Sequence, residues 1–372
     1  MKTIYLDYAA TTPTHEKVLR YFVKVSKQFI ANPNSGHNSG IAAALAIDKA
    51  LNSMRRLLKL PKRYMLTPTS GSSESNNLAL KGVAYSPEAK GKHIIISAFE
   101  HSSTTASANF LARQGFDIAV APNDEFGRLD IAKLEAMIRK DTILISICSI
   151  NPEIGIRQPI EEIKTMLKRH RQVLFHVDAT QSIGKYTLDY DGIDLVSLTA
   201  HKFFGLKGIG LLIKDKRVKL TPLIHGGHAT TIDRRGTPAT ELILSMGYAL
   251  KMALKYQDDN YETVKNINAY VRERLTSFKN IVIHSRPDDL PHILNFSIPG
   301  KKSKATVQYF SNKGIEISNH TACESSDDLS QGVLALTGDR QLAETSIRIS
   351  FSHLTTIEEV DRFMEVLREY CS

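Results

Sequence analysis

Short apolar runs alternate with longer amphipathic stretches in the first two thirds of this chain. Six runs rich in Ile, Val and Leu are typical of buried strands, and they cover residues 93–97, 117–121, 142–147, 173–177, 195–198 and 208–213. Between them, apolar residues recur at helical spacing, as in residues 131–138 and 160–167. This alternation predicts an α/β fold with a mostly parallel, doubly wound sheet and helices on both faces.

The pattern changes after about residue 236. A long helical region spans roughly residues 239–279, with an expected break near Asp258-Asp259-Asn260, and strands follow near residues 281–284 and 292–297. A final helix is predicted over residues 357–370. This mixture is typical of a smaller α+β domain. We expect a large domain over residues 13–257 and a small domain over residues 258–372 that also includes residues 1–12.

Composition places the chain among ordinary globular proteins, with 42% hydrophobic and 23% charged residues in a length of 372. No apolar run reaches the roughly 18 residues of a membrane span, and the N-terminus does not resemble a signal peptide. A cytoplasmic location is therefore the default expectation. The net charge of +9 is spread along the chain, which favours a basic face for an acidic protein partner over direct nucleic-acid binding.

The three cysteines are widely spaced and odd in number, which argues against a disulfide framework and against a zinc site. Cys148 lies within a predicted strand, and we interpret it and Cys371 as small buried apolar residues. Cys323 differs because it lies in the polar stretch Thr321-Ala-Cys-Glu-Ser-Ser-Asp-Asp, which lacks core periodicity. We expect its thiol to be exposed.

Two predicted strands end in residues that carry chemistry. Asp178 follows one apolar run, and Lys202 follows the next run and precedes a cluster of glycines. The strands should deliver both side chains to the same edge of the sheet, where α/β proteins bind ligands. A carboxylate beside a ring nitrogen and an amine beside an aldehyde are what pyridoxal 5'-phosphate (PLP) chemistry requires. The alternatives are a solvated surface lysine and an aspartate that caps the next helix.

Two further sites fit the same edge. The run Thr69-Ser-Gly-Ser-Ser-Glu-Ser-Asn-Asn77 opens a predicted helix over residues 74–85 and can surround an anion with N–H groups and hydroxyls. Helix capping by Ser72 or Ser73 is the simpler alternative. His101 follows another predicted strand, and it is either a structural histidine or a residue that lies on a cofactor ring and moves protons.

Together these residues resemble the cysteine desulfurases, the NifS-like branch of the class V aminotransferases of PLP fold type I. The matching motifs are Tyr5-Leu-Asp-Tyr-Ala-Ala-Thr-Thr12, Thr69 to Asn77, Glu100-His101, His176-Val-Asp-Ala-Thr-Gln-Ser182, His201-Lys202 and Ser346-Ile-Arg-Ile-Ser350. They extend over nearly the full chain. The resemblance implies a large domain whose mostly parallel seven-stranded sheet lies between helices, plus a smaller α+β domain.

The resemblance also implies roles for individual residues around the cofactor. Lys202 would form the Schiff base with PLP, Asp178 would contact the pyridine nitrogen and Gln181 the ring hydroxyl, while His101 would stack on the ring. The phosphate contacts would be Ser72, Ser73, Thr199 and His201, with Thr237 given to the neighbouring subunit of a homodimer.

The same resemblance implies a substrate and a reaction. Arg348 would bind the carboxylate of L-cysteine, with Asn32 as a second substrate contact. Cys323 matches the sulfur-accepting cysteine, so the expected reaction converts L-cysteine to L-alanine and leaves a persulfide on Cys323. His101 would transfer a proton near the sulfur. A protein acceptor in iron–sulfur cluster assembly or tRNA thiolation would then take that sulfur.

Two residues depart from the family pattern. Pro152 replaces an asparagine near the ring hydroxyl, and proline has neither a side-chain donor nor a backbone N–H. His320 replaces a glycine three residues before Cys323. These changes leave two alternatives open. One is another PLP reaction, such as selenocysteine cleavage, transamination or β-elimination, and the other is a non-catalytic scaffold protein.

Overall fold

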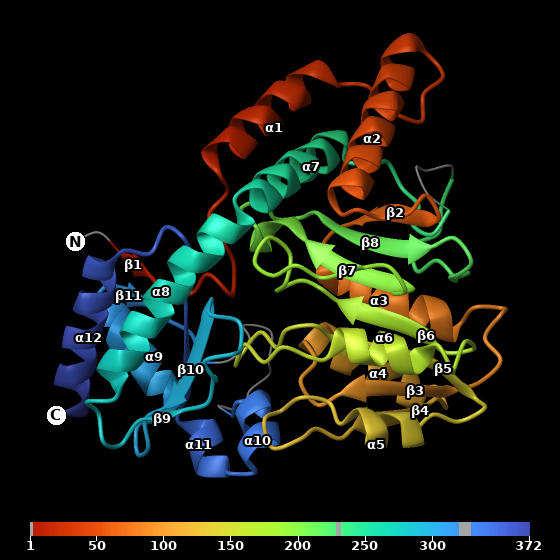
Figure 1. Ribbon diagram of the computed structural model, residues 1–372. Helices are drawn as coiled ribbons and strands as arrows, with labels where there is room; N and C mark the ends of the chain where they lie inside the picture. Colours follow the sequence, from red (N-terminus) through yellow and green to blue (C-terminus); the bar gives the residue numbers. More distant parts are fainter. Residues whose placement is uncertain (1–2, 228–231, 320–328) are drawn as a thin grey trace.

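The computed structural model describes residues 3–227, 232–319 and 329–372, and Figure 1 shows a large body built on one sheet beside a smaller body. The large sheet has seven strands in the order β2-β8-β7-β6-β5-β3-β4. Only β8 runs antiparallel to its neighbours, which confirms the prediction of a mostly parallel sheet. These strands are β2 (Tyr64–Thr69), β3 (His93–Ser97), β4 (Asp117–Ala121), β5 (Thr142–Cys148), β6 (Leu174–Asp178), β7 (Leu195–Thr199) and β8 (Gly210–Asp215).

Helices cover both faces of this sheet because successive strand residues point to opposite sides. In β3, Ile95 packs into the cluster shared with α5, α6 and α7, whereas Ile94 and Ile96 pack into the cluster shared with α3 and α4. Both sides of the strand are therefore buried, as its uninterrupted apolar run predicts. These helices are α3 (Ser72–Ala84), α4 (Ser102–Arg113), α5 (Ile131–Ala136), α6 (Ile160–Leu167) and α7 (Thr240–Lys255).

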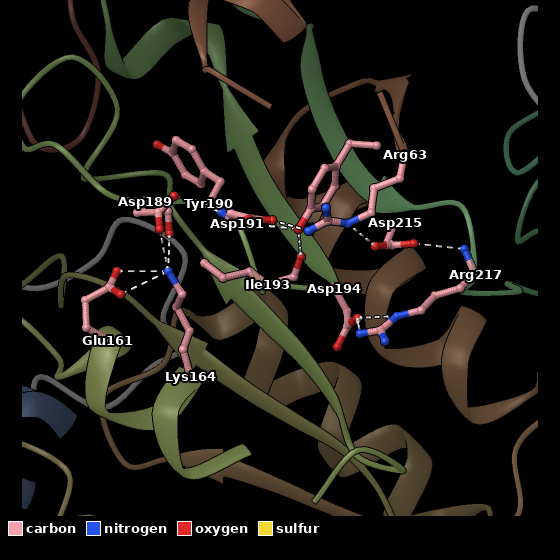
Figure 2. Close-up of polar contacts among 11 residues, drawn as sticks. Arg63, Glu161, Lys164, Asp189, Tyr190, Asp191, Ile193, Asp194, Asp215 and Arg217 are labelled. Carbon is pink, nitrogen blue, oxygen red and sulfur yellow. Dashed lines mark hydrogen bonds and ion pairs between the residues drawn. The ribbon is translucent and has the colours of Figure 1, made fainter. Parts of the chain in front are cut away.

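The connection between β6 and β7 is fixed by a row of polar contacts, shown in Figure 2. Lys164 on α6 donates to the Asp189 carboxylate at 3.0 Å, and Arg63 pairs with Asp215 at 2.9 Å as well as with Asp191. The buried Tyr64 hydroxyl donates to the carbonyl of Ile193 at 2.8 Å. These contacts hold the chain between the two strands whose ends carry Asp178 and Lys202.

The smaller body has a separate apolar core. Its strands are β1 (Ile4–Tyr5), which pairs in parallel with β11 (Ile315–Glu316), and β9 (Val282–Ile283), β10 (Ile293–Ser297) and β12 (Ser346–Ser350), which form an antiparallel sheet. Its helices are α8 (Gln257–Leu275), α9 (Ser303–Asn312), α10 (Gln331–Thr337), α11 (Arg340–Glu344) and α12 (Ile357–Cys371). The first strand of the chain therefore pairs with a strand about 300 residues later (Figure 1).

The long helical region breaks earlier than the sequence predicts. Helix α7 ends at Lys255 and α8 begins at Gln257, with Tyr256 between them. Asp258 and Asp259 lie in the first turn of α8, so the predicted break is confirmed but lies just before these residues, at Tyr256. Acidic side chains in a first helical turn interact favourably with the helix dipole, and they mark the beginning of α8.

Two N-terminal helices project beside α7 in Figure 1. Both α1 (Glu16–Gln28) and α2 (Asn38–Leu57) contact α7, yet they also leave large apolar side chains exposed. Leu19, Val23, Ile41 and Leu45 are 42–63% exposed. Within the described ranges, no helix has both the length and the apolar composition needed to cross a bilayer.

Candidate active site

A cavity opens where β6 and β7 end, as expected for the carboxyl ends of parallel strands. It encloses about 700 Å³ of space, including its open mouth. Strand β6 ends in Asp178, and β7 leads into a single 3₁₀ turn that contains Lys202. The cavity brings together eight of the predicted site residues, namely Ser72, Ser73, His101, Asp178, Gln181, His201, Lys202 and Arg348.

The Asp178 carboxylate is buried and receives two hydrogen bonds. Oδ1 accepts the Thr180 backbone N–H at 2.9 Å, and Oδ2 accepts the Asn76 side-chain amide at 2.7 Å. The first bond closes a local turn, and within the described residues no helix follows β6 directly, so the helix-capping alternative for Asp178 is wrong. The carboxylate also faces the cavity, so a turn-forming role and a ligand-binding role coexist.

The Lys202 amine is held against the N-terminal segment of the chain. Its Nζ donates to the carbonyl oxygens of Ala9 and Ala10, at 2.6 Å and 2.8 Å. Nζ therefore lies within the cavity, in contact with backbone rather than extended into solvent. A lysine placed in this way is suited to Schiff-base chemistry.

One end of the cavity is the N-terminus of α3. The residue before the helix is Gly71, and within the described residues no side chain caps this end, so the capping alternative for Ser72 and Ser73 is wrong. An uncapped helix N-terminus flanked by two hydroxyls favours an anion. Gly210 lets β8 approach closely, because a Cβ there would lie 2.6 Å from the Cα of Gly71.

Two other predicted phosphate residues lie nearby. Burial, with the Lys202 charge as the second cause, lowers the pKa of His201 to about 4, so this imidazole is neutral near pH 7. Its Nδ1 is 3.1 Å from the Thr11 hydroxyl. The buried Thr199 hydroxyl donates to the Ile209 carbonyl at 3.1 Å, which places it behind the residues that line the cavity.

His101 both caps a helix and lines the cavity. Its Nδ1 accepts the Ser103 backbone N–H at 3.1 Å, at the beginning of α4. Because Nδ1 acts as an acceptor, the ring proton of the neutral imidazole is on Nε2. Burial lowers the pKa of His101, which favours that neutral form.

Gln181 and Lys185 form a buried pair one helical turn apart. Gln181 donates from Nε2 to the Ala9 carbonyl at 2.9 Å, and its Oε1 accepts the Lys185 amine at 2.8 Å. Burial lowers the pKa of Lys185 to about 7. Because Lys185 binds the Gln181 oxygen, the Gln181 amide nitrogen is the end directed toward Ala9.

Arg348 is almost completely buried at the far side of the cavity. Nη1 donates to the Pro152 carbonyl at 2.9 Å, and Nη2 pairs with the Asp7 carboxylate at 2.7 Å. Within the described residues its Nε is buried and has no hydrogen-bond partner. Pro152 thus lines the cavity without a side-chain donor and contacts Arg348 through its backbone.

The remaining predicted site residues are not in this cavity. Thr237 lines a second cavity beside Thr69 and Arg234. Asn32 is exposed, and its side chain accepts the Asn34 backbone N–H at 2.9 Å. Cys323 and His320 lie outside the described residues.

The other two cysteines differ from each other. Cys148 is buried, as predicted, and it lines the cavity. Cys371 is exposed in the last turn of α12, so its expected burial is wrong. The end of a terminal helix has fewer neighbours to cover it than an internal strand has.

Sequence reasoning missed Asn76 and Lys185 as parts of the site. Asn76 stands in the quoted motif that begins at Thr69, but only the rotation of α3 shows that it faces Asp178. Lys185 lies four residues after Gln181, the spacing of neighbours on a helix. A turn, rather than a predicted helix, carries that spacing, so periodicity gave no signal.

These residues fit PLP on their chemistry. The cavity offers an anionic acceptor for a ring nitrogen at Asp178, an amine for an aldehyde at Lys202 and an uncapped helix N-terminus for a phosphate. The Arg348 guanidinium that lines the cavity adds a group that suits a substrate carboxylate. Each group that PLP chemistry needs is therefore present in one cavity.

Comparisons with known proteins agree with this geometry. The sequence profile of the family described as "Aminotransferase class-V" matches residues 4–363. Cysteine desulfurase IscS of Dictyoglomus turgidum is 36% identical over 371 residues, which cover 98% of this chain and 94% of that protein. Among solved structures, a NifS-like protein has a TM-score of 0.92 at 30% identity and covers 99% of both chains. The structure described as SspA in complex with cysteine has a TM-score of 0.81 at 30% identity, covering 95% of this chain and 100% of that one.

Proposed function

Because the chain belongs to the class-V aminotransferase family, we propose that it is a PLP-dependent cysteine desulfurase. It releases L-alanine from L-cysteine and passes the sulfur to Cys323. The observation that carries the proposal is the Lys202 amine and the Asp178 carboxylate in one cavity, with Arg348 at its far side. The relatives named cysteine desulfurase and the related structure named as a cysteine complex support cysteine as the substrate.

Each part of the cofactor would contact different residues of the cavity. When bound, PLP supplies an electron sink that stabilises negative charge at the α-carbon of an amino acid. Lys202 would hold its aldehyde carbon, Asp178 its ring nitrogen, Gln181 its ring hydroxyl and His101 the ring face. The phosphate would be held by Ser72, Ser73, Thr199 and His201, with Thr237 of the partner subunit.

Three side chains then act on the substrate. Arg348 binds the cysteine carboxylate, which fixes the α-carbon relative to the Lys202 amine. Lys202 acts as a general base when it takes the proton from that carbon. It acts as a general acid when it later returns a proton to the product. The Asp178 carboxylate would accept a hydrogen bond from the protonated ring nitrogen. His101 presents Nε2–H to the cavity, where the neutral ring can donate a hydrogen bond to the substrate sulfur.

Sulfur transfer needs a second thiol, and Cys323 supplies it in this proposal. Its thiolate attacks the substrate sulfur, so an S–S bond forms while the bond between that sulfur and the β-carbon breaks. The electron pair of the broken bond stays with the carbon, which takes up a proton to become the alanine methyl group. The products are L-alanine and a Cys323 persulfide, and no external oxidant or reductant is required.

A homodimer is part of the proposal. The exposed apolar side chains Leu19, Val23, Ile41 and Leu45 on α1 and α2 support a protein–protein contact there, because removing apolar surface from water is favourable. Thr237 lies outside the main cavity, beside a second cavity. A contact from Thr237 to the phosphate therefore requires the other subunit.

The sulfur acceptor is proposed to be a protein with an acidic surface. The net charge of +9 favours such a partner, because opposite charges speed encounter between proteins. The acceptor would take sulfur from the Cys323 persulfide for iron–sulfur cluster assembly or tRNA thiolation.

Pro152 favours a second candidate reaction at the same site. It lines the cavity and lacks the amide side chain that the family usually has there. Cleavage of a related amino acid such as selenocysteine is therefore the runner-up. A purely structural role agrees less well with Lys202 and Asp178 lying together in the cavity.

The proposal is tested by supplying purified protein with PLP, L-cysteine and a reducing thiol, and measuring alanine and sulfide. Alanine release that requires both PLP and Lys202 supports it. Selenocysteine serves as the competing substrate in a parallel assay. No alanine from L-cysteine with the cofactor bound would reject the proposal, and turnover of selenocysteine alone would favour the runner-up.

A further inference from the structure

Asn76 is a fully buried amide that joins two residues of the cavity. Its Nδ2 lies 2.7 Å from the Asp178 carboxylate and 2.9 Å from the Ser103 hydroxyl oxygen. That hydroxyl is 2.8 Å from Nδ1 of His101. Asn76 therefore stands between the acid expected at the ring nitrogen and the histidine expected on the ring face.

Charge sets the orientation of the Asn76 amide. The Asn76 oxygen is buried and, within the described residues, has no hydrogen-bond partner. Turning the amide over would place this oxygen against the Asp178 carboxylate, where two acceptors would repel each other. The amide stays as it is because an ionised Asp178 demands a donor, and this demand leaves the Asn76 oxygen unpaired.

We propose that Asn76 is a positioning residue whose amide N–H holds the Asp178 carboxylate and keeps it aimed into the cavity. Asp178 receives two donors, and the Thr180 backbone N–H is the other one. A buried carboxylate stays charged only when such donors replace the water that it has lost. The assignment of PLP to the cavity rests on the proposed function, whereas the pairing of Asn76 with Asp178 does not.

Helix α3 supplies a matched control in the next residue. Asn77 is partly exposed, donates to the Ser73 carbonyl of its own helix and accepts from Lys81. Asn76→Asp and Asn77→Asp make the same isosteric change one position apart. Only the first puts a second carboxylate against Asp178, and two adjacent carboxylates in one site do not both ionise readily. Glu100, His101, His176, Cys148 and Lys202 also lie near Asp178 and are unchanged in both variants.

The first measurement uses the full-length protein without cofactor. In Asn76→Asp the carboxylate pair shares a proton, so its pKa is raised and stability is lost as pH rises. The denaturation midpoint of this variant should decrease as pH is raised from about 5 to about 8. The midpoint of Asn77→Asp should follow that of the wild type over the same range. Adding Asp178→Asn to Asn76→Asp restores a carboxylate–amide pair and should abolish the fall.

The second measurement is the dissociation constant of PLP, obtained by absorbance titration. Relative to wild type at the same pH, Asn76→Asp should bind PLP at least about tenfold more weakly at pH 6, where the proton shared by the pair removes charge from Asp178, and this deficit should shrink at pH 8 as the pair loses that proton. Asn77→Asp should change less than about twofold. The double variant should bind PLP weakly at both pH values because its carboxylate is no longer at position 178.

The outcomes separate this inference from the proposed function. If Asn76→Asp follows Asn77→Asp in stability and in PLP binding at every pH, the role of Asn76 is rejected. If Asp178→Asn alone leaves PLP binding unchanged, the cofactor assignment fails. The stability coupling between positions 76 and 178 would still stand in that case.

Discussion

The amine of Lys202 lies 2.6 Å from the carbonyl oxygen of Ala9, across 193 positions of sequence. The same oxygen accepts the Gln181 amide, and the Ala9 N–H donates to the Ser350 hydroxyl at 2.8 Å. One residue of the N-terminal segment thus binds the Lys202 amine through its carbonyl, while a strand of the smaller body binds its N–H. The site depends on contacts between both bodies.

Ser350→Ala tests this dependence. The change leaves the buried Ala9 N–H without its acceptor, and an unsatisfied buried donor costs about 1–3 kcal/mol. We expect that loss in the free energy of unfolding, measured with urea. Trapping of the PLP adduct on Lys202 by borohydride should also slow. Ser277→Ala, at an exposed serine just after α8 whose hydroxyl donates to the Arg274 carbonyl, should change neither quantity. Equal trapping rates would show that the segment does not position Lys202.

Glu100→Gln should change how stability depends on pH. Burial raises the pKa of Glu100 to about 8, with one carboxylate oxygen accepting the Ser97 hydroxyl and the Cys148 N–H. An acid with a raised pKa stabilises the fold at low pH and loses this contribution as pH rises toward 8.

Glutamine mimics the protonated acid, so Glu100→Gln should gain stability over wild type by a few kcal/mol from about pH 5 to pH 8. Urea unfolding across this range measures the difference. The exposed Glu125→Gln is the control. Parallel pH curves for wild type and Glu100→Gln would mean that Glu100 is ionised at neutral pH.

Lys185→Met should affect stability in the alkaline range and also affect cofactor binding. Burial lowers the pKa of Lys185 to about 7 from 10.5, so the folded protein gains stability as pH rises between these values. A methionine side chain cannot titrate, so this gain should disappear in the variant. The variant also releases Gln181, and we expect PLP binding to weaken by about tenfold. The exposed Lys251→Met should preserve both behaviours. If Lys185→Met still gains stability as pH rises above 7, the gain belongs to a titratable group other than Lys185.

Arg348→Lys should raise KM for L-cysteine by about 10–100-fold, with a smaller effect on PLP binding. Lysine cannot contact Pro152, Asp7 and a substrate carboxylate at once, as the planar guanidinium can. Steady-state alanine release against cysteine concentration measures the change. Arg340→Lys, at an exposed ion pair, is the matched control. An unchanged KM would remove Arg348 from the substrate site.

The sequence predicted the larger features because they depend on local pattern. The runs in β3 and β5 are apolar on both faces. Asp178 is the last residue of another such strand, β6, and Lys202 lies in the turn that follows β7. Strands β1 and β11 contain only two residues each and exist through pairing across the chain, so no local pattern marks them. Tertiary contact, rather than propensity, determines such elements.

The roles of Asn76 and Ala9 were also beyond sequence reasoning. Asn76 could equally have faced solvent, as its neighbour Asn77 does, because one step along a helix changes direction by about 100°. Ala9 acts through its backbone carbonyl, and no side chain records that contact. Positions of this kind become visible only when segments far apart in sequence are brought together.

The central claim is that PLP chemistry on L-cysteine delivers sulfur to Cys323, and one single-turnover experiment tests it. The PLP-loaded protein is mixed with an equimolar amount of L-cysteine and quenched in acid without reductant. Alanine is then quantified, and the mass of the peptide that contains Cys323 is measured by mass spectrometry.

We predict one alanine for each Cys323 peptide that gains a single sulfur atom. Cys323→Ala should bind PLP normally and form at least about a hundredfold less alanine. Cys371→Ala should behave as wild type. Full alanine formation in Cys323→Ala, or sulfur found on Cys371 instead, would contradict the account.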